Sequence, residues 1–239
     1  MTEDGVSGVG SDGDAAARDW SRRLGWAFGL VADDPAVRAA ALARLGRASR
    51  NAEDALDRWN ELWQLTLPLG PQEQYQEPAF RRARDVYSVA CGHCLPQGLW
   101  STHPGVDITA WPGLPYGLLF LEWEARYPRE WTRHAKAWSA KQSLIRKLAV
   151  PGHDETVRTK LTDLVELVVL RAYRCKDREY VRVARAVDGE DLRRRLGAAA
   201  EATDPWARVH AGYVLWLLDR PEVPNTRHVW RTWLAAGPH

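Results

Sequence analysis

The spacing of apolar residues limits the fold of this chain more than any other feature. From Asp14 onward nearly every segment repeats apolar side chains at intervals of three and four residues, the period of an α-helix. No stretch alternates with period two, and no Asn-Gly or Asp-Gly turn separates two apolar runs. We therefore predict an all-α fold. The clearest stripes are Trp20, Leu24, Phe28 and Val31; Leu56, Trp59, Trp63 and Thr66; Phe80, Ala83, Val86 or Tyr87, and Ala90; and Trp131, His134, Trp138, Lys141 or Gln142, and Ile145.

Helix start signals divide the chain into about ten or eleven short helices. Asp34-Pro35 and Asp204-Pro205 each place a capping acid before a proline at the first helical position, where the missing N–H costs nothing. Short connections between such helices favour antiparallel pairs. Further caps are predicted at Asn51, Asp154, Asp177 and Asn225.

Composition separates a tail, one domain and one long loop. Residues 1–13 are Gly, Ser and acidic residues with little to bury, and we expect a flexible tail there. Residues 14–239 are predicted to form a single all-α domain. Within it, residues 95–115 are rich in proline and glycine and carry two tryptophans, so we expect a long irregular loop.

Composition also excludes several classes of protein. With 45% apolar and 27% charged residues, the 239-residue chain can bury a core. Three cysteines cannot staple a secreted fold of this size, which indicates a reducing compartment. No apolar run is long enough to span a bilayer, and the first residues lack the apolar core of a signal peptide. We therefore expect a cytoplasmic protein with no membrane partner.

A short phrase recurs at three predicted helix starts. Residues 34–41 read DPAVRAAA, residues 154–161 read DETVRTKL and residues 204–211 read DPWARVHA. Each has Asp first, Arg fifth and a small or apolar residue eighth, which suits a capped helix that another helix approaches closely. The phrase resembles the second helix of HEAT-type repeats. That resemblance implies paired helices stacked into a solenoid, and an irregular helical bundle is the alternative.

Cys91-Gly92-His93-Cys94 is the same tetrapeptide as the redox site of protein disulfide isomerases. That chemistry needs a strand before the first cysteine and a helix after it, whereas here a predicted helix runs into Cys91, so we do not expect disulfide exchange. Cys91, Cys94 and His103 have a spacing that could hold zinc, with His93, Asp107 or Cys175 as a fourth ligand. The alternative is a pair of thiols that close a helix end without metal.

Most of the 13 tryptophans lie on helical stripes and are predicted to be core. Trp100 and Trp111 lie instead on the Pro/Gly loop, so they are the tryptophans we expect to contact a partner. His210 lies in an apolar helix and is predicted to be a core histidine. The chain carries no metalloprotease, phosphate-loop or nucleophile-elbow motif, and we name no catalytic residue.

The net charge of +2 hides an uneven distribution. Residues 1–125 hold 11 basic and 17 acidic side chains, and residues 126–239 hold 22 and 14, so the halves carry −6 and +8. An arginine stripe in the second half is a candidate anionic docking surface. Lys176-Asp177 interrupts its apolar side, which leaves open whether the stripe is continuous or is split in two by a new helix capped by Asp177. The alternative to a docking surface is a solvated face that neighbouring acids neutralise. The stripe consists of Arg171, Arg174, Arg178, Arg182 and Arg185.

Two classes of function fit these observations. The first is a non-catalytic helical scaffold that binds a protein or another anionic partner, with the arginine stripe and the loop tryptophans as its contacts. The second is a DNA-binding protein or DNA-repair enzyme, because the chain is similar to the HEAT-like alkylpurine DNA glycosylases in helical class, Trp content and basic second half. No motif carries a catalytic residue over from that family, so we expect a binding module without a cofactor, zinc being the only candidate metal.

Overall fold

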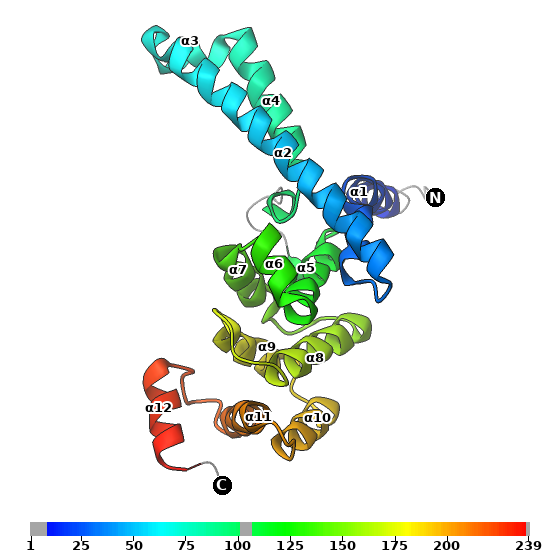
Figure 1. The fold of residues 1–239 in the computed structure, drawn as a ribbon, viewed down its shortest axis with the longest axis vertical. Coiled ribbons are helices and arrows are strands. Elements are labelled where there is room, and N and C mark those ends of the chain that lie inside the picture. Colours follow the sequence, from blue (N-terminus) through cyan, green and yellow to red (C-terminus); the bar gives the residue numbers. More distant parts are fainter. Residues whose placement is uncertain (1–8, 101–106, 238–239) are drawn as a thin grey trace, which may run out of the picture. The chain divides into compact units, whose positions relative to one another are not determined.

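A computed structural model describes residues 9–100 and 107–237 of the chain, and its regular structure in these ranges is entirely helical. Twelve α-helices and five 3-10 helices occupy the described ranges, with no strand among them (Figure 1). The all-α prediction is thus confirmed. No helix in this part of the chain is both long enough and apolar enough to cross a membrane.

Contacts group the residues into two compact units, where the composition predicted one domain from residue 14 to residue 239. The first unit comprises Met1–Val106, Ala110–Trp123 and Arg129–Ala135. The second comprises Asp107–Thr109, Glu124–Pro128 and Lys136–His239.

A long hairpin of α2 and α4 dominates the first unit (Figure 1). Its helices are α1 (Val9–Leu24), α2 (Pro35–Thr66), α3 (Pro71–Gln76), α4 (Pro78–Gly92), α5 (Leu114–Arg126) as far as Trp123, and α6 (Pro128–His134) from Arg129. Its 3-10 helices are η1 (Gly25–Val31), η2 (Leu67–Leu69) and η3 (Gln97–Trp100). Proline stands at the first position of α2, α3 and α4, where it preorganises the helix without losing a hydrogen bond.

Two predictions for the first unit are corrected. Helix α1 begins at Val9, so residues 9–13, which were expected to belong to a flexible tail, are helical. Asn51 is not a cap but lies inside α2, which continues for 32 residues. The long apolar stripe of α2 packs against α4, and this tertiary contact keeps the helix going past a residue that favours helix ends.

The second unit stacks shorter helices. They are α7 (Trp138–Leu148), α8 (Glu155–Val169), α9 (Tyr180–Ala186), α10 (Glu190–Ala200), α11 (Pro205–Leu218) and α12 (Arg227–Ala235), with η4 (Ile108–Ala110) as far as Thr109 and η5 (Asp177–Glu179) as 3-10 turns. Helix α8 packs on α9 and α10, and α11 packs on α10, α9 and α8 (Figure 1). The valines of α8 and the leucines of α10 and α11 make the core between them.

The predicted caps divide into two groups. The side chains of Asp34, Asp154 and Asp204 accept hydrogen bonds from backbone N–H groups of the first helical turn, as predicted. Asp177 and Asn225 do not cap helices. Asp177 is buried in an ion-pair cluster, and Asn225 accepts from the Tyr213 hydroxyl and donates to the carbonyl of Arg178.

The predicted stripe from Trp131 to Ile145 is also divided. Helix α6 ends at His134 and α7 begins at Trp138, and between them Lys136 has a φ of 44°, which a helix cannot contain. The three repeat phrases begin α2, α8 and α11, helices of 32, 15 and 14 residues. The stacking of such helices into a HEAT-like array remains a prediction.

Candidate functional site

The arginine stripe is not one helix. Helix α8 ends at Val169, and residues 170–176 form an irregular turn that ends with Lys176 in the left-handed region, at a φ of 71°. Helix α9 begins only at Tyr180. The five arginines therefore leave the backbone from three different local structures, and each has a different role.

Arg171 and Arg174 point into the second unit and bind a buried acid. Glu124 is fully buried, and its two oxygens accept from Arg171 Nη2 at 2.8 Å and from Arg174 Nε at 2.7 Å. Arg171 Nη1 also lies 2.8 Å from Asp177 Oδ2. These two arginines therefore serve the interior more than an external partner.

Lys141 joins the same buried cluster. Its Nζ lies 2.8 Å from Glu124 Oε2 and 2.6 Å from Asp177 Oδ1, and its side chain is fully buried. Two carboxylates thus meet three cations inside the second unit. Removing either carboxylate would leave cations without compensation in a medium that solvates them poorly.

Three arginines of the stripe lie nearer the surface. Arg182 Nε binds Glu179 Oε2 at 3.1 Å. Arg185 donates to the carbonyls of Leu217, Arg220 and Val223, and so closes the C-terminal end of α11. Arg178 is exposed and has no carboxylate within ion-pair distance in the described part of the chain.

Arg178 lies beside a pocket that the sequence did not reveal. The cavity has a volume of about 390 Å³, within the range of small-molecule sites. Five valines from α8, α9 and α11 form an apolar part of its wall, and aromatic side chains form most of the rest. The lining residues are Val165, Val168, Val169, Tyr173, Asp177, Arg178, Tyr180, Val181, Trp206, His210, Tyr213, Val214, Arg227 and Trp230.

The aromatic part of the pocket is built around His210. Its ring centroid lies 5.8 Å from that of Tyr173, 5.9 Å from that of Trp206 and 5.8 Å from that of Trp230. Trp230 in turn meets Tyr213 edge to face at 4.7 Å. Trp206 is 58% exposed and Tyr173 is 53% exposed, so ring surface remains available for a ligand.

The polar groups of the pocket are few. Tyr180 is buried, and its hydroxyl has no hydrogen-bond partner within the described ranges. Burial raises the pKa of Tyr180 well above its ordinary value, so the hydroxyl keeps its proton and remains a donor. Burial also lowers the pKa of His210 below 6.5, so the imidazole is neutral near pH 7. Arg227 is exposed and, like Arg178, has no carboxylate partner among the described residues.

The two loop tryptophans have different surroundings. Trp111 is 6% exposed, and its ring meets Trp20 edge to face at 5.4 Å, so it belongs to the core of the first unit. It is therefore not available as the surface anchor that its place on the loop suggested. Trp100 ends η3 and is 37% exposed.

The candidate zinc ligands are only partly described. Cys94 is buried at the end of α4, where its Sγ lies 3.5 Å from Ser49 Oγ, and burial raises the pKa of its thiol. A raised thiol pKa opposes metal binding, because the thiolate is the ligand. Cys91 is half-buried, and His103 lies outside the described residues. Within the described ranges no three His, Cys, Asp or Glu side chains come together as a metal site.

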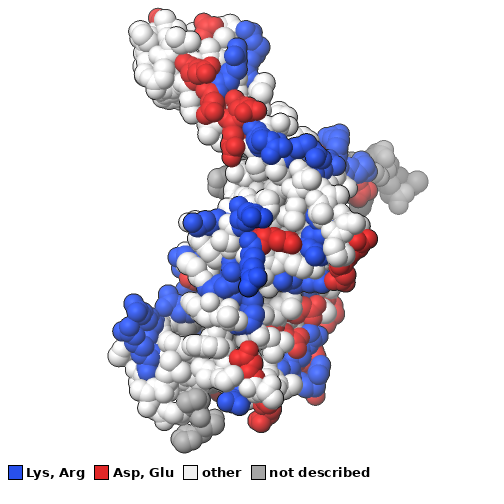
Figure 2. Space-filling model, viewed as in Figure 1, with Lys and Arg blue, Asp and Glu red and all other residues white. Residues whose placement is uncertain are grey.

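Basic and acidic side chains occur in alternating groups on the visible face of the molecule (Figure 2). The excess of basic residues after residue 125 is thus not spread as an even basic surface there. Part of it is consumed by internal pairs such as those of Arg171 and Arg174.

Comparison of the chain with protein-family models, with curated proteins and with solved structures finds no match. The pocket must therefore be interpreted from its own chemistry.

Sequence reasoning missed Trp206 and Trp230 as site residues and assigned His210 to the core. One signal was present, because Trp206, His210, Tyr213 and Val214 recur at spacings of four, three and one along α11 and share a face. The pattern marks a buried face equally well, so it does not distinguish a pocket wall from a core.

Proposed function

We propose that the protein is a non-catalytic binding module that holds an anionic protein partner on its second unit. One observation carries this proposal: Arg178 and Arg227, neither paired with a carboxylate in the described ranges, border a largely apolar, aromatic pocket. Arginine beside exposed aromatic rings is the composition typical of the centre of a protein interface.

The partner that suits this site presents an apolar side chain next to acidic residues. Its apolar group would fill the pocket, and its carboxylates would bind the two arginines as charge-assisted hydrogen bonds. A cationic group in an aromatic cage is a poorer match. Asp177 is the only carboxylate among the described lining residues, and both its oxygens are occupied by Lys141 and Arg171.

A DNA partner uses the same chemistry, because aromatic rings stack on extruded bases and arginines bind phosphates. The valine-rich lining argues for a less polar occupant, since base recognition needs hydrogen-bonding groups. The test therefore includes DNA as an alternative outcome.

The experiment measures binding of three probes to the full chain: a random copolymer of glutamate and tyrosine, polyglutamate and a DNA duplex, at about 50 mM and 200 mM salt. We expect the copolymer to bind more tightly than polyglutamate, because only the copolymer supplies aromatic groups. The variant R178Q/R227Q should bind the copolymer about tenfold more weakly, or weaker still, than the native chain does.

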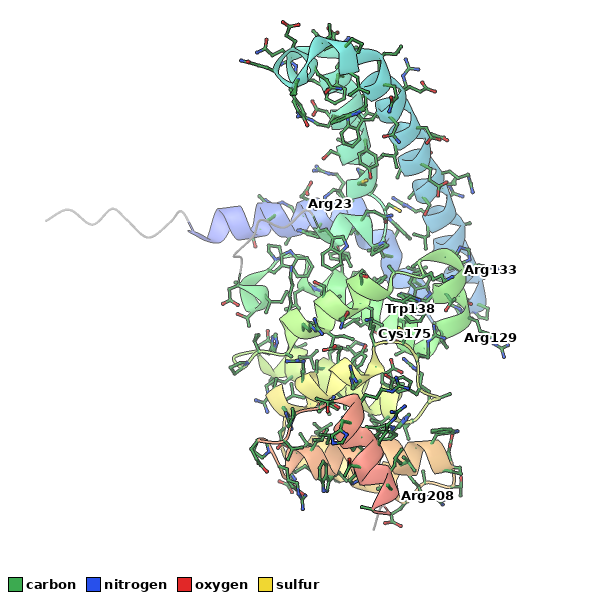
Figure 3. All side chains as sticks on the ribbon, turned by 90° about the vertical axis from the view of Figure 1, so that its left-hand side faces the viewer. Arg23, Arg129, Arg133, Trp138, Cys175 and Arg208 are labelled. Carbon is green, nitrogen blue, oxygen red and sulfur yellow. The ribbon has the colours of Figure 1, made fainter. Side chains whose placement is uncertain are left out.

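A matched control removes two exposed arginines that do not line the pocket. R194Q/R208Q changes the net charge equally, and Arg208 lies on α11 (Figure 3). If the two double variants weaken binding equally, attraction is unspecific and the site is wrong. Tighter binding of the duplex than of the copolymer would favour the DNA alternative.

A further inference from the structure

We infer that the pocket of the second unit is a binding site for a small aromatic acid. This rests on the proposed function only in using the same two arginines. The ring system of the ligand lies against the valines and the aromatic wall, and its acid group binds Arg178 and Arg227.

The apolar part of the argument comes from the walls. Val165, Val168 and Val181 are joined by two further valines, and the cavity volume of about 390 Å³ accommodates a two-ring compound. Neutral His210 adds a flat, uncharged face between Tyr173 and Trp230, with centroid distances of 5.8 Å to each ring. Offset or edge contacts with such rings favour a planar aromatic group over a linear chain.

The acid is assigned from charge. Arg178 and Arg227 line the pocket and have no carboxylate partners in the described chain. Asp177 is the one carboxylate among the described lining residues, and its oxygens are held by Lys141 and Arg171. An anionic group on the ligand supplies the missing counter-charge.

Calorimetry on the full chain tests these assignments with two probes, 2-naphthoate and the uncharged 2-naphthamide. We expect 2-naphthoate to bind, and the amide to bind about tenfold more weakly. The variant R178Q/R227Q should lower the affinity for 2-naphthoate to nearly that for the amide, whereas the control R194Q/R208Q should leave the affinity for 2-naphthoate within about twofold.

Three results would overturn the inference. They are no binding of 2-naphthoate up to about 1 mM, equal affinity for the acid and the amide, and equal losses of 2-naphthoate affinity in R178Q/R227Q and in the control R194Q/R208Q. Binding of 2-naphthoate is measured separately from binding of the glutamate–tyrosine copolymer. A chain that binds 2-naphthoate but not the copolymer therefore disproves the proposed function and leaves the aromatic-acid site standing, and the reverse pattern does the opposite.

Discussion

Glu124 offers the sharpest test of the buried cluster. The variant E124Q keeps the size of the side chain but removes its charge, and the native carboxylate receives Lys141, Arg171 and Arg174 at 2.7 to 2.8 Å. Breaking one partner out of a buried ion pair costs about 3–5 kcal/mol. The side chains of Arg171 and Arg174 are 15% and 21% exposed, so water solvates part of the charge that E124Q leaves uncompensated. We therefore expect the free energy of unfolding to fall by about 3 kcal/mol.

Urea unfolding followed by circular dichroism measures this loss. The control R194Q removes a surface pair with Asp191 and should change the free energy of unfolding by less than about 0.5 kcal/mol. The double variant E124Q/K141M removes one negative and one positive charge from the cluster. Its loss in free energy of unfolding should be smaller, by at least about 1 kcal/mol, than the sum of the losses in E124Q and K141M. An E124Q protein within about 1 kcal/mol of the native chain, or strict additivity, would refute the view that these charges depend on one another.

Three further predictions concern local structure and pH. Gly113→Ala should destabilise the chain by about 1–3 kcal/mol, because a Cβ there would overlap two tryptophan rings. Gly197→Ala in α10, where a Cβ meets nothing within 4 Å, should stabilise the chain by about 0.5 kcal/mol. Thermal melting compares the two variants, and equal effects on the melting temperature would contradict the packing argument. Asp204→Ala should cost about 1 kcal/mol through loss of the α11 cap, and an unchanged unfolding midpoint would show that the cap is dispensable. Hydrogen bonds from Arg146 lower the pKa of Glu179 from 4.5 to about 2, so the contribution of Glu179 to stability is complete above pH 4.5 and is lost as the pH falls toward 2. The stability of E179Q should therefore not change with pH through this group between pH 4.5 and 2. Acid-unfolding curves of E179Q and the native chain that coincide would contradict the assignment.

Local sequence predicted what local energetics decide. Asp34, Asp154 and Asp204 cap helices because a carboxylate and the N–H groups it accepts from lie within one turn of chain. Asn51 failed as a cap because its neighbours pack along α4 and prolong the helix. Asp177 failed for a related reason, since an oppositely charged residue 36 positions away binds it more favourably than a helix end does.

The candidate site was predictable only in part. Arg178 was selected from the stripe and does border the pocket, whereas Arg171 and Arg174 were selected by the same spacing and turn inward. Spacing along a helix cannot tell these cases apart, because the acid they bind lies on another helix. Arg227 lies on α12, outside the stripe, and no spacing within it points to that residue.

The sequence alone determined that the chain is helical, where several helices begin and that it carries no familiar catalytic motif. These properties follow from period, capping and composition, which act over a few residues. Only the tertiary structure decided that Lys141 is buried, that Trp111 is core and that Tyr180 and Trp230 share a pocket. Burial and pairing depend on which distant segments meet, and the free energy of a charge or an aromatic ring is set by those neighbours more than by its own type.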